Sequence, residues 1–283
     1  MDRPIELLPG LPRLGPVFAR ALLPSGARQA ELPAHTVLVN DHAQNLDRLS
    51  EYARVCGFTL RDTVPPTWLH VLSFPLQVAL LGSRDSTIRL VGVIHVSNRM
   101  RLWRPVGASE RLQVMVHAAN LRPHRRGALV DLVGQVRVAD ELVWDGVSTY
   151  LAPGRTAPGQ PDVSPQPAFE AITPTAQWRL PADLGRQYRR VSGDPNPIHT
   201  HRLAARAFGF DRPIIQGMWT HARLLAALEN RLPGAYAVSA QFVRPILLPA
   251  TVGFTARPTA DGWEAAVTTP EGRKPYLVAT LSA

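Results

Sequence analysis

Alternating apolar and polar positions mark two long stretches of the chain. Four β-branched, apolar runs follow one another in the first stretch, at residues 86–100, 110–122, 128–140 and 141–152. Four more runs occupy the second stretch, at residues 235–248, 251–259, 262–270 and 276–283. Alternation broken by short polar segments is typical of antiparallel strands. The pattern therefore predicts an antiparallel sheet in each half of the chain.

Each predicted sheet is preceded by an apolar segment of helical character. Residues 67–81 predict a buried helix, which Pro75 should kink or interrupt. Residues 202–210 predict a short helix, and residues 218–232 a longer one with Leu224, Leu225 and Leu228 on or near one face. Both halves thus have a helix followed by strands.

The halves also share a local signature, which indicates a duplicated fold. Arg104-Pro105 and Arg244-Pro245 lie at matching places, since residue numbers 104 and 244 differ by 140. Between the halves, prolines crowd residues 152–175 and indicate a semi-extended linker. We therefore expect an α+β protein with an N-terminal domain at 1–151, the linker at 152–175 and a C-terminal domain at 176–283.

Composition is that of a soluble globular protein. Hydrophobic residues make up 45% of the 283 residues, which is enough for a core. The one cysteine, Cys56, rules out an internal disulfide framework and fits a reducing compartment. The start of the chain lacks the features of a signal peptide, and no apolar run approaches the roughly 20 residues of a membrane span. We expect a cytoplasmic protein without a membrane span.

The net charge of +9 comes largely from arginines that are scattered along the sequence. They form no basic run with interleaved aromatic residues, so we expect no nucleic-acid partner. A solvated basic surface explains the charge, and binding of an anionic cofactor such as coenzyme A is the alternative. His70, His201 and His221 show no metal-ligand spacing, and we predict no metal.

One loop concentrates the polar chemistry. Asp194, Asn196 and His199 lie within six residues and are separated by Pro195 and Pro197. The prolines disfavour both a helix and a paired strand, which predicts a rigid, irregular loop. An acid, an amide and an imidazole together can be turn chemistry or an active site. Only the second half contains such a loop.

The segment from Tyr188 to Gly217 resembles the hydratase-2 motif of MaoC-like (R)-specific enoyl-CoA hydratases and 3-hydroxyacyl-thioester dehydratases. Its elements occur in order: Ser192-Gly193-Asp194, Asn196-Pro197, His199, an Ala-rich helix, Gly209-Phe210, Pro213-Ile214 and Gly217. Phe242, Arg244 and Pro245 also fit the strand that follows the helix in that family. The resemblance implies a double hot-dog fold, with two tandem antiparallel sheets each wrapped round a central helix and a catalytically degenerate first half.

The resemblance also implies a reaction, the reversible hydration of trans-2-enoyl thioesters to (R)-3-hydroxyacyl thioesters. Asp194 and His199 would be the catalytic pair, and Asn196 would orient them. Gly217, at the expected N-terminus of the central helix, would donate its amide to the thioester carbonyl. The implied substrate-binding residues are Phe208, Gly209, Phe210, Pro213, Ile214, Gln216 and Arg244, although apolar residues such as Phe208, Phe210 and Ile214 more often belong to a core than line an acyl tunnel. Coenzyme A or acyl carrier protein would be the substrate carrier, with no other cofactor.

Two positions depart from the family pattern. Gln216 stands where many members have a histidine and cannot titrate, and His201 replaces a commonly acidic residue.

Two other functions remain open. A hot-dog thioesterase usually needs a carboxylate on the central helix, and this helix has none before Glu229. A non-catalytic acyl-thioester-binding subunit would not require an intact loop. The sequence is compatible with a monomer or a homodimer.

Overall fold

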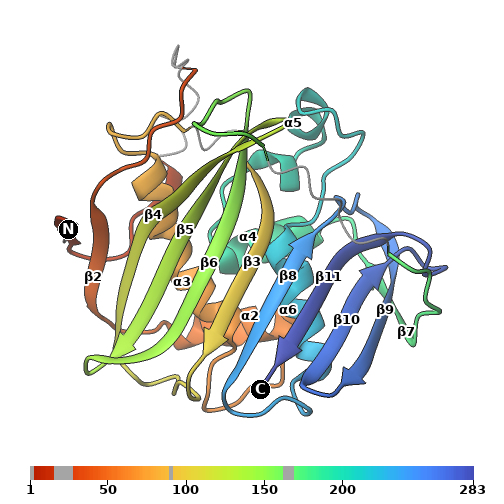
Figure 1. The fold of residues 1–283 in the computed structure, drawn as a ribbon. Coiled ribbons are helices and arrows are strands. Elements are labelled where there is room, and N and C mark those ends of the chain that lie inside the picture. The colour runs from red at the N-terminus through yellow and green to blue at the C-terminus, as the bar shows by residue number, and fades with distance from the viewer. Residues whose placement is uncertain (1–2, 16–27, 89–91, 162–168) are drawn as a thin grey trace. The chain divides into compact units, whose positions relative to one another are not determined.

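The computed structural model describes residues 3–15, 28–88, 92–161 and 169–283 (Figure 1). Contacts divide the chain into two compact units. The first comprises Met1–Asn45 and Asp62–Ser164, and the second comprises Leu46–Arg61 and Pro165–Ala283. One of the boundaries between the units, at residues 164 and 165, lies within the expected linker, of which residues 162–168 lie outside the described residues.

A curved sheet forms most of the first unit. Its strands are β1 (Ile5–Leu8), β2 (Thr36–His42), β3 (Ile94–Leu102), β4 (Leu112–His124), β5 (Gly127–Val138) and β6 (Glu141–Pro153). They pair in the order β1-β2-β4-β5-β6-β3, with β1 parallel to β2 and the other pairs antiparallel. The sequence patterns predicted β3 to β6 but not β1 or β2. Residues 89–91 of the first expected strand lie outside the described residues, and β3 begins after them.

Helix α3 (Pro66–Leu81) packs against this sheet, contacting β2 to β6. In Figure 1 it lies on one face of the yellow-green strands β4, β5 and β6. The helix is buried on nearly all sides, as its almost uninterrupted apolar sequence predicts. Pro75 does not interrupt it, so the helix continues for two further turns beyond the position where we allowed for a break.

The second unit repeats this plan. Its sheet contains β7 (Ala176–Leu180), β8 (Tyr236–Phe242), β9 (Ala250–Thr259), β10 (Gly262–Thr268) and β11 (Pro275–Ser282). All pairs are antiparallel, in the order β8-β11-β10-β9-β7. Helix α6 (Gly217–Leu228) packs against β10 and β11. The expected strand at 235–248 stops at Phe242, because the residues after it pair with the segment before α6.

Helix α2 (Leu46–Cys56) belongs to the second unit although it comes from the first half of the sequence. It packs against α6 and against α4 (Leu184–Ser192), and it buries Leu49, Tyr52 and Cys56. The indole nitrogen of Trp219 donates to the Val55 carbonyl at 3.0 Å. We expected residues 1–151 to form one domain, and this long-range packing is not encoded in any local pattern.

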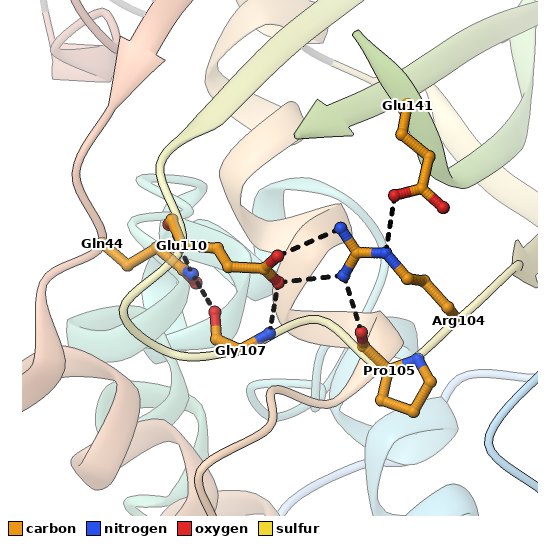
Figure 2. A network of polar contacts seen from close by, with 6 residues as sticks. All are labelled: Gln44, Arg104, Pro105, Gly107, Glu110 and Glu141. Carbon is orange, nitrogen blue, oxygen red and sulfur yellow. Dashed lines mark hydrogen bonds and ion pairs between the residues drawn. The ribbon is translucent and has the colours of Figure 1, made fainter. Parts of the chain in front are cut away.

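The connection between β3 and β4 is fixed by a polar network around Arg104 (Figure 2). The guanidinium contacts Glu110 at 3.0 Å and Glu141 at 2.9 Å, and it also donates to the Pro105 carbonyl. Glu110 in turn accepts from the Gly107 amide at 2.6 Å, and Gln44 donates to the Gly107 carbonyl at 2.9 Å. The first Arg-Pro pair therefore has a structural role within its unit.

Across the ranges that the structure describes, no helix is long and apolar enough to cross a membrane. Within the same ranges, no three His, Cys, Asp or Glu side chains gather as a metal site would require.

Candidate active site

The end of helix α4 positions Asp194, the acid of the motif. The helix ends at Ser192, and Gly193 takes a left-handed conformation with φ of 77° while its amide donates to the Arg189 carbonyl at 2.8 Å. Glycine is the residue that adopts this conformation without steric cost. The chain therefore turns sharply, and Asp194 follows directly after the helix end.

Asp194 and Asn196 both bond to the backbone two residues further on. Oδ1 of Asp194 accepts from the Asn196 amide at 3.0 Å, and Oδ1 of Asn196 accepts from the Ile198 amide at 3.3 Å. The second bond caps the short helix η1 (Pro197–His199), which carries the imidazole. The turn chemistry and the active-site interpretation are thus compatible, since the turns fix Asp194 and His199.

His199 is held by one ring nitrogen and faces Asp194 with the other. Nδ1 lies 2.9 Å from the Ile214 carbonyl oxygen, and Nε2 lies 3.4 Å from Oδ2 of Asp194. A carbonyl can only accept, so Nδ1 carries a proton, and in the neutral ring Nε2 is an acceptor. The side chains of His199 and Asp194 are 10% and 16% exposed. In that tautomer of the neutral ring, two acceptors face each other in a mostly buried place.

Close backbone packing sets the position of His199, and sequence reasoning missed the residue responsible. A Cβ on Gly185, in the first turn of α4, would overlap the His199 carbonyl oxygen. The Gly185 carbonyl also accepts from Nε2 of Gln216 at 3.4 Å. A glycine inside a helix was the one available signal, because it is otherwise unfavourable there.

Gln216 and Gly217 form the start of α6. Gly217 is the first residue of the helix, so its amide has no acceptor within the helix. A Cβ on Gly217 would lie 2.9 Å from the Phe242 ring, which gives this glycine a packing reason as well. Oε1 of Gln216 is buried and accepts no hydrogen bond within the described ranges.

The segment before α6 is anchored to the segment after β8. The Ile215 amide donates to the Ile246 carbonyl at 2.9 Å, and the Leu248 amide donates to the Pro213 carbonyl at 2.8 Å. These bonds place the Ile214 carbonyl where it meets His199. They also bring the stretch that contains Arg244, whose side chain is exposed, alongside the start of α6.

A buried phenol lies behind the loop. Burial raises the pKa of Tyr188 well above its usual value, and the charge of Asp194 adds to this rise. A hydrogen bond with Tyr52 and the positive charge of Arg48 act in the opposite direction. Burial lowers the pKa of the Arg48 guanidinium. Tyr188 is therefore neutral at physiological pH, with side chains of both charges acting on it.

The structure thus brings together Asp194, Asn196, His199, Pro213, Ile214, Gln216 and Gly217. Three other residues from the motif lie at the C-terminal end of α5 (Arg202–Ala207): Phe208 is 44% exposed, Gly209 is exposed and Phe210 is half-buried. The amides of Gly209 and Phe210 bond back to carbonyls of α5. Among the described residues, no hydrogen bond or ion pair joins these three residues to the Asp194–His199 pair.

Known proteins share both the sequence and the fold. Residues 164–272 match the MaoC like domain family. The chain is 37% identical over 264 residues to 3-hydroxyacyl-thioester dehydratase X of Mycobacterium tuberculosis. This alignment covers 93% of this chain and 94% of that protein. The crystal structure of HtdX from the same organism matches with a TM-score of 0.78 and 35% identity, over 87% of this chain and 99% of that chain.

The fold itself extends to more distant proteins. A Mycobacterium tuberculosis protein with a double hot-dog fold matches with a TM-score of 0.55 at 16% identity, over 95% of this chain and 98% of that chain. The α+β double hot-dog architecture that the sequence predicted is confirmed. The chain belongs to the MaoC-like dehydratase family.

Proposed function

We propose that this protein catalyses the reversible hydration of trans-2-enoyl thioesters to (R)-3-hydroxyacyl thioesters. The observation that supports this most is the tautomer of His199, which the Ile214 carbonyl fixes through Nδ1. The neutral ring then presents the lone pair of Nε2 beside Oδ2 of Asp194. A substrate water has two protons and can donate one to each acceptor.

Such a water is oriented and activated at the same time. The Asp194 carboxylate and His199 hold its protons, which leaves an oxygen lone pair directed at C3 of the enoyl group. As the C3–O bond forms, one of the two groups takes the proton of the water and delivers a proton to C2. Oxygen and hydrogen then arrive on the same face of the substrate, and the enzyme returns to its initial protonation state.

The negative charge that develops on the thioester oxygen needs a donor. The amide of Gly217 lies at the N-terminus of α6, where the helix dipole favours negative charge. We assign it as the oxyanion donor. Asn196 is assigned to the orientation of the loop, since its side chain caps the helix that carries His199.

The carrier of the acyl group, coenzyme A or acyl carrier protein, presents phosphate in either case. Arg104 and Arg244 occupy matching Arg-Pro pairs, but their surroundings differ. Two carboxylates bind Arg104, whereas Arg244 is exposed and forms no ion pair among the residues described. Arg244 also lies on the stretch that borders the start of α6. We assign Arg244 to the carrier phosphate.

The proposal is tested by incubating the pure protein with crotonyl-CoA and with a longer trans-2-enoyl-CoA. Loss of the enoyl-thioester absorbance, with an (R)-3-hydroxyacyl-CoA product identified by chiral chromatography, is the expected result. A thiol reagent added in parallel detects free coenzyme A, which a thioesterase would release. Thiol release without hydration, or an (S) product, would contradict the proposal.

A further inference from the structure

Helix α2 contributes a cation to the end of α4. Nε of Arg48 donates to the Val191 carbonyl at 2.7 Å. Val191 lies in the last turn of α4, where backbone carbonyls have no amide partner within the helix. A guanidinium at this end also interacts favourably with the helix dipole. Arg48 therefore caps α4 from a segment that is more than a hundred residues away in the sequence.

The same side chain lies beside the turn that leads to Asp194. Nη2 of Arg48 is 3.6 Å from the place that a Cβ on Gly193 would occupy. Gly193 is the left-handed residue that directs the chain from α4 to Asp194. Arg48 is thus bonded to the residue two before the turn and lies beside the turn itself, from which Asp194 follows directly.

The neighbourhood of Tyr188 links the two side chains further. Its buried phenol is close enough to Arg48 and Asp194 for both charges to act on its pKa, in opposite directions. Tyr52, on α2, packs against Tyr188 with ring centroids 6.2 Å apart. Arg48 and Tyr52 are four residues apart and so lie on the same face of α2. This face of α2 therefore packs against α4, the helix from which the Asp194 loop continues.

We infer that Arg48 is a positioning residue for Asp194, supplied by the first half of the sequence to the site in the second unit. Its contribution to turnover rests on the function proposed above. Its contribution to loop order does not, because the hydrogen bond to Val191 exists without substrate. The role that we infer for Arg48 operates through the end of α4 and the turn at Gly193.

The test compares Arg48→Met with Arg54→Met. Methionine keeps an unbranched apolar stem but removes the donor and the charge. Arg54 is the matched control, since it lies on the same helix, is exposed and pairs only locally with Glu51 at 2.8 Å. We expect Arg48→Met to lower kcat at least tenfold while KM changes less than threefold, and Arg54→Met to leave both constants unchanged.

Amide hydrogen exchange provides a readout that needs no activity. In Arg48→Met, exchange of the peptide covering residues 190–199 should accelerate while the strands of the same unit keep wild-type protection. Arg48→Lys keeps a charge and one donor, and it should restore part of both effects. If Arg48→Met fails to fold, Arg48→Lys alone decides, with an intermediate kcat and faster exchange at 190–199 expected.

The inference would be overturned if folded Arg48→Met had both the kcat and the exchange rates of the wild type. If only Arg48→Lys folds, the same result in that variant would overturn it. Uniformly faster exchange across the unit would also overturn it, because that result indicates general destabilisation. An inert wild-type enzyme would refute the proposed function instead, and the exchange data would still decide the role of Arg48.

Discussion

His199 combines one ring nitrogen held by a backbone carbonyl with a second that faces Asp194, and this is the central feature of the site at the scale of single residues. The Ile214 carbonyl determines which nitrogen carries the proton. The Asp194 carboxylate is likewise fixed at Oδ1 and faces the imidazole with Oδ2. Each group uses one polar atom to hold its position, and in the mechanism that we propose the other atom binds the water.

Gly185 sets the distance between α4 and η1, and a side chain there should disturb the pair. Gly185→Ala adds a methyl group that overlaps the His199 carbonyl oxygen. Alanine normally stabilises a helix interior relative to glycine by roughly 0.5–1 kcal/mol, so a loss of stability would identify the clash. We expect a lower melting temperature and a fall in kcat of about tenfold or more, since displacements near 1 Å are costly.

Gly10→Ala provides the control for this substitution. A Cβ at Gly10 meets no atom within 4 Å, and its backbone is not left-handed. The melting temperature and kcat of Gly10→Ala, measured by calorimetry and by the hydration assay, should equal those of the wild type. Wild-type kcat in Gly185→Ala would show that the close approach has no part in positioning His199.

His70, in α3, should make stability depend on pH. Burial lowers the pKa of His70 to about 4 in the folded protein, whereas an unfolded histidine titrates near 6.5. Between these values the unfolded state binds more protons, so the free energy of unfolding falls as pH decreases through this window. The full loss of unfolding free energy is about 3 kcal/mol. No loss remains at pH values above the pKa of the unfolded histidine.

Urea unfolding at several pH values from 7 to 4 measures this dependence. His70→Leu should flatten the slope in that window, while His201→Ala, which changes an exposed histidine, should retain it. An equal slope in His70→Leu and the wild type would mean that His70 does not remain neutral when folded.

At the scale of elements, the duplicated Arg-Pro turns show how equivalent segments diverge. In the first unit the arginine is bound by Glu110 and Glu141, which holds its pKa above the usual value, and the turn is rigidly tied to β4 (Figure 2). In the second unit the corresponding arginine is exposed. The absence of ion-pair partners for Arg244 among the described residues is consistent with our proposal that it binds the carrier phosphate.

The two arginines should therefore respond differently to substitution. Arg244→Ala should raise KM for enoyl-CoA about tenfold with little change in kcat or melting temperature, because a charged hydrogen bond contributes roughly 1.5–3 kcal/mol. Steady-state kinetics with crotonyl-CoA and crotonyl-pantetheine, which lacks the nucleotide phosphates, measures the effect. The penalty should shrink with the truncated substrate.

Arg104→Ala is the matched comparison. It should lower the melting temperature by a few degrees, since it breaks a network in a unit of this size, and leave KM unchanged. A raised KM in Arg104→Ala, or an unchanged KM in Arg244→Ala, would contradict the assignment of Arg244 to the carrier phosphate.

At the scale of the whole molecule, the sequence halves do not coincide with the compact units. Residues 46–61 pack in the second unit, where Thr59 donates to Glu229 at 3.0 Å and Trp219 donates to Val55. The second half of the sequence therefore lacks part of its own core and the cap of α4. We infer that the two halves need each other to form the site.

A fragment of residues 165–283 should consequently fail to fold cooperatively. The same fragment with residues 46–61 joined by a flexible linker should regain a cooperative thermal transition, followed by circular dichroism. A sharp transition in the shorter fragment would show that α2 is dispensable for the unit.

Local sequence patterns predicted much of this architecture. Alternation predicted β4, β5 and β6 with nearly correct ends, because each has one face on the core and neighbours that are close in sequence. The ordered motif singled out Asp194, Asn196 and His199, which the structure holds in one loop, while their catalytic roles stay a prediction. Neither kind of signal placed α2, since the partners of Leu49, Tyr52 and Cys56 are distant in sequence. Arg48 and Gly185 were missed for the same reason, as each acts through a tertiary contact.

The most direct test of the account is hydration of crotonyl-CoA by Asp194→Asn and His199→Ala, beside the control variants Asp183→Asn and His201→Ala. The control positions lie near the loop and are exposed. General acid–base groups typically contribute 100- to 10,000-fold, so each loop variant should lose kcat by about this range while it remains folded. The controls should keep wild-type rates. Folded loop variants with wild-type kcat would show that the Asp194–His199 pair does not activate the water.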